Sequence, residues 1–263
     1  MSQPQQAICH LFTVPVNMML AFLYHRVGDG KYANSPAMME KNLAWIADSF
    51  RVVLPGEPLR RLSIDVCLTF DDATYDFYHY LFPMLKRLKL RALLAVPTQF
   101  IQTNTTIDPA KRLSIPYSLA MKDDIYRTHC PFCTWQELRE MSQSGFVEIA
   151  SHSIHHQNLL TPGLDLDLEI RGSKQILEDQ LQVPVRTFVY PLGKFNRKIH
   201  EQVKKDYEFA MRIGTAWNMS WQNMSGIIYR VISDNMISPD HHFCNRKKIS
   251  YLWFYLLNTF RRR

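Results

Sequence analysis

Two adjacent aspartates, Asp71 and Asp72, follow the apolar run "CLTF" and carry side chains suited to catalysis. Three histidines, His152, His155 and His156, follow a second apolar run, "VEIAS". One carboxylate and two imidazoles form a ligand set that suits zinc or a similar divalent ion with an open position for water. The second carboxylate can stay off the ion and act as a general base on water. The residues alone leave open which aspartate takes which role.

The spacing of the histidines bears on how two of them could reach one ion. His152 and His156 stand four residues apart, and a helical turn would bring side chains at this spacing onto one face. We therefore expect the chain to leave the strand through a helical turn at residues 152–156. His155 is the alternative to His156 as the second imidazole ligand.

Two further polar groups also stand after apolar runs. His25 and Arg26 follow "MMLAFLY", and "YPLGKFN" follows "RTFV". Within the second group, Pro191 and Gly193 are expected to shape a loop in which the backbone N–H of Leu192 faces an oxyanion.

These clusters need strands to bring them together, and the hydrophobic pattern supplies them. Apolar runs at 16–27, 63–70, 92–97, 147–151, 186–191, 208–213 and 227–232 alternate with amphipathic stretches such as 35–50, 77–90 and 135–145. This alternation predicts parallel pairing, and its length favours one domain, 1–263, built as a βα barrel. The carboxyl ends of the strands then share one face, where the clusters converge. Residues 101–133 are expected to form a loop excursion over one mouth of the barrel.

Three stretches in order, "LTFDDA", "SHSIHHQNL" and "FVYPLGKFN", resemble the NodB-type polysaccharide deacetylases, carbohydrate esterase family 4. The resemblance extends over "LAFLYHRVGDG", "CTWQELREMSQSGFVEIASH" and "YRVISD". The "YHRV" and "YPxG" patterns resemble one branch of that family. The resemblance implies a distorted (β/α) barrel that hydrolyses N-acetyl groups from amino sugars with a divalent metal, usually zinc.

Matched onto this chain, the resemblance assigns Asp72, His152 and His156 to the metal and Asp71 to the general base. His155 then becomes a polar wall residue. The sequence also departs from the family pattern, because Ala73 stands in place of a glycine after the aspartate pair.

The commonest form of the third motif has an arginine that orients the base and a tyrosine, where this chain has Val189 and Leu192. The late Leu-x-His motif that supplies the general acid in the family has no counterpart here. His25, His241 and His242 are the candidates for that role, and we take His25 as the first of them.

The charge of the chain is concentrated at its C-terminal end. The formal net charge is +7, and residues 245–263 contain six basic side chains and no acid, which leaves +1 for the rest. A nearly neutral body does not predict a nucleic-acid surface. The basic aromatic segment 245–263 is expected either to pack on the barrel as a helix or to lie on an anionic membrane.

The start of the sequence, "MSQPQQAICHLF", does not follow the pattern of a secretory signal. We therefore expect a cytoplasmic protein, with the inner face of the membrane as the place of any peripheral contact. Five scattered cysteines do not resemble a disulfide framework. Cys130 and Cys133 in "HCPFC" are expected to be reduced surface thiols, with half of a zinc site or a redox pair as the alternative.

Two classes of function follow from this sequence. The first is a metal-dependent hydrolase that removes an acyl group from an amino sugar of a polysaccharide or glycan precursor. The second is a sugar-binding barrel without turnover, which the altered third motif and the absent Leu-x-His motif suggest.

Overall fold

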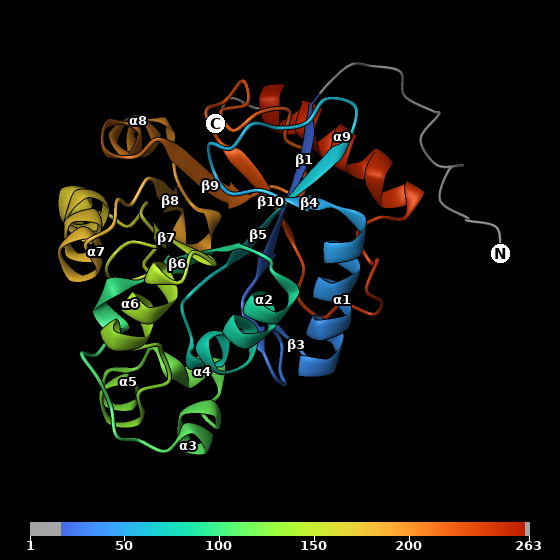
Figure 1. Ribbon diagram of the computed structural model, residues 1–263. Helices are drawn as coiled ribbons and strands as arrows, with labels where there is room; N and C mark the ends of the chain where they lie inside the picture. The colour runs from blue at the N-terminus through green and yellow to red at the C-terminus, as the bar shows by residue number, and fades with distance from the viewer. Residues whose placement is uncertain (1–16, 261–263) are drawn as a thin grey trace.

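The computed structural model describes residues 17–260, and within them seven parallel strands close into a barrel surrounded by helices (Figure 1). The strands are β1 (Met18–Tyr24), β5 (Ile64–Phe70), β6 (Ala92–Val96), β7 (Val147–Ser151), β8 (Thr187–Val189), β9 (Phe209–Ile213) and β10 (Ile228–Ile232). Their order is β1-β10-β9-β8-β7-β6-β5, and β1 closes the ring by pairing with β5 from Met18↔Ile64 to Tyr24↔Phe70. The predicted distorted (β/α) barrel is confirmed.

Three shorter strands lie around this ring. β4 (Arg51–Val52) pairs with Asp65 and Val66, at the start of β5. β6 pairs with Thr69 and Phe70, so β4 and β6 pair with opposite ends of β5. β2 (Arg26–Val27) and β3 (Ala33–Asn34) form a separate pair just after β1.

The barrel strands alternate between two environments. One set of positions forms a cluster of mostly small or sulfur-containing side chains, which includes Met19, Ala21, Cys67, Leu93, Ala95, Ala150, Met211 and Ile228. The intervening positions belong to the larger core that includes residues of the surrounding helices. Because side chains of a strand point alternately to its two faces, the first set fills the barrel interior. On β5 the same alternation places Thr69 inside and continues to Asp71, the first residue after the strand.

Long helices surround the barrel, and local sequence explains several of their boundaries. They are α1 (Pro36–Ser49), α2 (Phe82–Leu88), α6 (Trp135–Gln143), α7 (Ser173–Leu181), α8 (Arg197–Asp206) and α9 (Asn245–Phe260). Ser35 caps α1 and Asn196 caps α8 through their side chains, and α6 begins with a capping box formed by Thr134 and Glu137.

The predicted helix 77–90 is divided into two parts. A π-helical turn, η1 (Phe77–Leu81), precedes α2. Pro83 at the start of α2 cannot donate a backbone hydrogen bond, which accounts for a change of helical hydrogen bonding at this point. A second π-helical turn, η3 (Leu168–Gly172), precedes α7, and short 3-10 turns occur at η2 (Thr98–Phe100) and η4 (Pro191–Gly193).

Residues 101–133 contain three short helices, α3 (Pro109–Leu113), α4 (Tyr117–Ala120) and α5 (Asp123–His129), which lie together at one end of the molecule (Figure 1). Cys130 and Cys133 are free but buried, so the expectation of surface thiols is wrong. Burial raises the pKa of the Cys133 thiol well above its ordinary value, which leaves it protonated and unreactive.

The C-terminal helix α9 lies on the far side of the molecule from α3–α5 (Figure 1). It packs on the barrel through Tyr251 and Tyr255, which are buried, and Trp217 donates its indole N–H to the carbonyl of Lys248. Residues 1–16 and 261–263, which include the start of the sequence and three of the C-terminal arginines, lie outside the described residues. None of the helices in 17–260 combines the length and apolarity that crossing a bilayer requires.

Candidate active site

The aspartate pair lies where the chain leaves β5. The backbone N–H of Asp71 donates to the carbonyl of Tyr24 at 2.9 Å, which continues the β1–β5 pairing by one residue. Asp72 and Ala73 then adopt left-handed backbone angles, with φ of 71° and 52°. Glycine adopts such angles more readily than alanine, which fits the glycine that the resemblance implies at the position of Ala73. It also separates the two carboxylates, because one stays in the line of the strand and the other leaves it.

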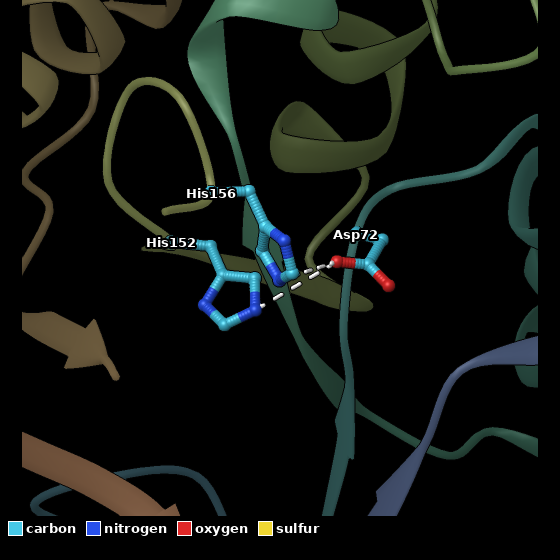
Figure 2. Close-up of side chains that lie close together, drawn as sticks. All are labelled: Asp72, His152 and His156. Carbon is cyan, nitrogen blue, oxygen red and sulfur yellow. Dashed lines mark ion pairs between the residues drawn. The ribbon is translucent and has the colours of Figure 1, made fainter. Parts of the chain in front are cut away.

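Asp72, His152 and His156 come together to form a candidate metal site (Figure 2). One ligand atom from each residue lies within 4.8 Å of the other two. Oδ1 of Asp72 is 3.3 Å from Nε2 of His156 and 3.7 Å from Nε2 of His152. One buried imidazole, one partly buried imidazole and a buried carboxylate that point at one small space form a typical set for a divalent first-row metal.

The hydrogen bonds around these three residues also fit a metal. Nδ1 of His152 is 2.8 Å from the carbonyl oxygen of Val189, which can only accept, so Nδ1 carries the proton and Nε2 presents its lone pair. Burial lowers the pKa of His152 to about 4, which keeps the imidazole neutral at pH 7. Oδ1 of Asp72 is buried and accepts no hydrogen bond from residues 17–260. A buried carboxylate oxygen without a donor is costly unless a cation takes that place.

The turn that carries the histidines is not helical, which corrects the prediction for residues 152–156. Ser153 and His156 have left-handed φ angles of 63° and 52°, and the N–H of His156 donates to Oγ of Ser153 at 3.1 Å. His155 points elsewhere, because its Nδ1 lies 2.5 Å from Oε1 of Glu169. Glu169 also accepts the backbone N–H groups of Ile154 and His155. His155 therefore helps to hold the turn and lies outside the ligand cluster.

Asp71 is paired with Arg230 of β10, a residue that the sequence analysis did not select. The guanidinium donates to both carboxylate oxygens, at 2.6 and 2.9 Å, and both side chains are buried. Burial alone would raise the pKa of Asp71, but the charge of Arg230, with further contributions from His152 and His25, holds it well below its usual range. Asp71 is therefore ionised and can accept a proton.

Arg230 supplies the basic side chain that the third motif lacks at Val189. The sequence contained a signal for it, since Arg230 is the one charged residue in the apolar run "IIYRVI". A buried charge within a barrel strand requires a partner of opposite charge. Asp71 can be that partner because it follows β5, and only β1 lies between β5 and β10 in the ring. The absence of the motif arginine therefore does not leave Asp71 without a basic partner.

His25 lies just beyond β1 and is held by Asp234, another residue that the sequence analysis did not assign. Nδ1 of His25 is 2.7 Å from Oδ2 of Asp234, and the backbone N–H of His25 donates to Oδ1 at 3.0 Å. Burial acts to lower the pKa of His25, but the hydrogen bond to Asp234 and the charges of Asp72, Asp71 and Asp234 outweigh it and raise the pKa to about 9. His25 is therefore protonated at neutral pH.

The other two candidates for the general acid lie elsewhere. His242 is buried between Phe22 and Tyr251, with Nδ1 at 3.0 Å from the Tyr251 hydroxyl, and burial lowers its pKa to about 3. His241 packs edge-on against His242. Both belong to the layer beneath α9, and neither has a contact with Asp71, Asp72 or their partners in the described part of the chain.

Leu192 lies in the 3-10 turn η4, which follows β8, with a left-handed φ of 56°. Its side chain is 56% exposed. The two backbone N–H groups that follow it are engaged, because Gly193 donates to the carbonyl of Tyr190 and Lys194 to that of Pro191. The oxyanion role of the Leu192 N–H stays a prediction.

Tyr117, from the segment 101–133, also reaches the site. Its hydroxyl lies 2.6 Å from Oδ2 of Asp72, and its ring contacts the rings of His25 and Tyr32. Burial, followed by the charge and hydrogen bond of Asp72, raises the pKa of the Tyr117 hydroxyl, so it keeps its proton and donates it to the carboxylate. Nothing in the local sequence indicated this contact.

Comparison with known proteins places these features in a family. The family model described as polysaccharide deacetylase matches residues 62–210, more than half of the chain. The chain belongs to this family. The matched region contains Asp71, Asp72, the histidine turn and Leu192. His25, Arg230 and Asp234 lie outside it, and the closure of the barrel brings them to the site.

Individual relatives agree with the family. YxkH of Bacillus subtilis (strain 168) is 24% identical over 194 residues. The poly-β-1,6-N-acetyl-D-glucosamine N-deacetylase of Escherichia coli (strain K12) is 34% identical over 192 residues, 61% of this chain. The alignment with YxkH covers 70% of this chain and 60% of the length of YxkH. The chain spans only 27% of the length of the E. coli protein.

Solved structures of deacetylases share the fold. A polysaccharide deacetylase from Bacillus cereus superposes with a TM-score of 0.70 at 18% identity, over 86% of this chain and 68% of that chain. The Streptococcus pyogenes deacetylase PplD, solved in complex with acetate, gives a TM-score of 0.67 at 20% identity, over 87% of this chain and 97% of that chain. At these identities the likeness establishes the barrel fold of the family.

Proposed function

We propose that the protein is a metal-dependent deacetylase that hydrolyses the N-acetyl group of an amino sugar in a glycan. The observation that carries the proposal is the buried Oδ1 of Asp72, which accepts no hydrogen bond within the described part of the chain and faces two imidazole nitrogens beside the ionised Asp71. The E. coli relative is named for the deacetylation of poly-β-1,6-N-acetyl-D-glucosamine, which suggests a related glycan as the substrate here.

The ligands would be Oδ1 of Asp72 and Nε2 of both His152 and His156, with zinc the most suitable ion for this donor set. When bound, a divalent metal would polarise the amide carbonyl and make water more acidic. Asp71, held by both terminal nitrogens of the Arg230 guanidinium, would accept a proton from the attacking water.

The leaving nitrogen of the amide needs a proton before the C–N bond breaks. His25 is protonated and oriented by Asp234, and would donate that proton to give the free amine and acetic acid, which then ionises to acetate in water. The backbone N–H of Leu192 would donate to the oxyanion that forms on the acyl carbon. Each group then has one role, and the proton that enters at Asp71 balances the one that leaves at His25.

The alternative, a sugar-binding barrel without turnover, is less well supported. It was motivated by the missing arginine and the missing Leu-x-His motif. Arg230 and the His25–Asp234 pair provide side chains of the required types beside the aspartates. The "YHRV" and "YPxG" patterns would place the protein in the branch of the family that shares them, and this assignment is part of the proposal.

The location of the enzyme stays a prediction. We propose a cytoplasmic enzyme that acts on a glycan precursor and contacts the inner face of the membrane through α9. The basic residues Arg246, Lys247 and Lys248 begin this helix, and exposed apolar side chains follow them.

The decisive experiment measures metal content and acetate release together. Purified protein is stripped with a chelator and reloaded with zinc, and hydrolysis is followed on oligomers of β-1,6- and β-1,4-linked N-acetylglucosamine. Asp72→Ala and His152→Ala should lose both the metal and the activity. Asp71→Asn should keep the metal and lose about a hundredfold or more in turnover, the scale expected for general base catalysis.

Two results would contradict the proposal. Full metal content in both Asp72→Ala and His152→Ala would remove the assigned ligand site. Near-normal turnover in metal-loaded Asp71→Asn would remove the assigned base.

A further inference from the structure

The segment 101–133 sends one side chain into the candidate metal site. Tyr117, the first residue of α4, donates its hydroxyl to Oδ2 of Asp72 at 2.6 Å. The other oxygen of the same carboxylate, Oδ1, is the one that faces His152 and His156. The two oxygens of Asp72 therefore have different surroundings: Oδ2 has a donor, whereas Oδ1 has none among the residues that the structure describes.

The chain that leads into Tyr117 is held on the N-terminal side of α4. Before it, the carbonyl of Ile115 accepts a hydrogen bond from Nη1 of Arg26, and Nε of Arg26 pairs with the buried carboxylate of Asp76. This contact ties the chain next to Tyr117 to the barrel, just after the end of β1. The hydroxyl is thus brought to Asp72 by a fixed backbone.

A second anchor lies earlier in the segment, at the buried side chain of Arg112. Its guanidinium donates to the carbonyls of Cys130 and Phe132 and to both carboxylate oxygens of Glu137, and it stacks over the ring of Tyr75 at 3.4 Å. These bonds join α3 to the C-terminal end of the segment 101–133 and to the first turn of α6.

We propose that Tyr117 is a positioning residue that limits Asp72 to one metal-binding oxygen. The inference rests on the proposed metal site. With Oδ2 engaged by the hydroxyl, the carboxylate can offer only Oδ1 to the ion, together with the two imidazoles. This arrangement suits zinc and similar ions, whereas Ca²⁺ prefers more oxygen ligands and often takes both oxygens of a carboxylate.

Metal binding by the metal-free, full-length protein tests this proposal without reference to activity. Competition with a chromophoric chelator gives the Kd for Zn²⁺ and for Co²⁺. Tyr117→Phe keeps the ring and removes the hydroxyl, and we expect its Kd for Zn²⁺ to rise about 10- to 100-fold, the usual effect of losing a hydrogen bond to a metal ligand. The visible spectrum of the Co²⁺-loaded variant should also change, because Oδ2 becomes free to reach the ion.

Tyr32→Phe is the matched control. The ring of Tyr32 contacts those of His25 and Tyr117, but within residues 17–260 its hydroxyl makes no hydrogen bond to a ligand. Its metal affinity and Co²⁺ spectrum should equal those of the unmodified protein. Thermal unfolding of both metal-free variants should be alike.

Two results would overturn the proposal. The first is a Kd for Tyr117→Phe within twofold of the unmodified protein, with an unchanged spectrum. The second is a loss of metal-free stability in Tyr117→Phe, absent from Tyr32→Phe, that equals the loss of metal affinity, because the hydroxyl would then support only the fold. Asp72→Ala separates this failure from a failure of the proposed function: if that variant also keeps its metal, the assigned site itself is wrong.

Discussion

Asp71 and Arg230 form a two-point ion pair in which both side chains are buried, and the barrel depends on both partners. Removing one member of such a pair leaves an uncompensated buried charge, which costs about 3–5 kcal/mol. We therefore expect Arg230→Met to lower the free energy of unfolding by about that amount in urea denaturation of the metal-free protein. Combining it with Asp71→Asn should recover part of the loss, because neither variant side chain is charged. Strictly additive losses in the double variant would mean that the two residues are not coupled.

His25 should control the alkaline side of the pH–activity profile. Its pKa is raised from 6.5 to about 9, so its acid form persists above neutrality and is lost as the pH rises. A bound cation opposes the charges of Asp71 and Asp72, so we expect kcat/KM to fall with an apparent pKa between these two values. Asp234→Asn removes one negative charge and should move this fall to lower pH. If the profile of Asp234→Asn is unchanged, His25 is not the acid.

The same shift has a consequence for stability. The folded protein binds the His25 proton more tightly than the unfolded chain does. The contribution of this proton to the free energy of unfolding is therefore complete below pH 6.5 and disappears as the pH rises through about 9.

Local motifs indicated the candidate site residues that stand close together in the sequence. They could not indicate residues that reach the site only because the barrel closes. Asp71, Asp72 and the histidine turn stand in short recognisable stretches. Arg230 and Asp234 lie 159 and 209 residues from their partners, so their pairing depends on the closure of the barrel. Only the charge of Arg230 within an apolar strand hinted at it.

At the scale of elements, the turn 152–156 depends on η3, the π-helical turn that carries Glu169. The buried carboxylate of Glu169 accepts two backbone N–H groups of the turn and contacts the ring of His155. Glu169→Gln would place the side-chain amide N–H groups close to the backbone N–H groups of the turn, and two donors cannot pair. We expect a loss of about 1–3 kcal/mol in the free energy of unfolding, together with lower zinc occupancy, because His156 lies in the same turn.

Glu40→Gln provides the comparison for this variant. Glu40 pairs with Arg87 on the surface, so its change should alter stability by less than about 0.5 kcal/mol and leave zinc binding intact. Equal behaviour of the two variants would show that Glu169 does not hold the turn.

The elements that the sequence predicted well are those with repeated local signals. Hydrophobic periodicity marked α1 and α6, and apolar runs marked all seven barrel strands. The turn 152–156 was predicted as helical because spacing alone cannot reveal left-handed backbone angles at Ser153 and His156. The three helices of 101–133 are too short to produce a periodic pattern.

At the scale of the whole molecule, α9 presents an apolar face away from the barrel. Its exposed side chains are Ile249, Leu252, Trp253, Phe254 and Leu256. We expect the protein to sediment with anionic vesicles at low salt and to be released at high salt. Ile249→Ser combined with Trp253→Ser should abolish sedimentation while sparing the barrel, since both side chains are more than 60% exposed.

The control lies in a different part of the surface. Ile237 is 82% exposed and precedes α9, so Ile237→Ser should leave vesicle binding unchanged. If the unmodified protein ignores anionic vesicles at low salt, membrane contact through α9 is wrong.

The closure of the barrel between β1, β5 and β10 also determines when the site can exist during protein synthesis. A ribosome releases the chain from its N-terminus, so Asp71 emerges long before Arg230, and His25 long before Asp234. Until β10 has left the exit tunnel, the aspartate has no guanidinium to neutralise it and the histidine has no carboxylate to orient it. A nascent chain that stops short of β10 therefore carries the proposed metal ligands without the partners of Asp71 and His25, and the proposed site is complete only after the last strand of residues 17–260 has been translated.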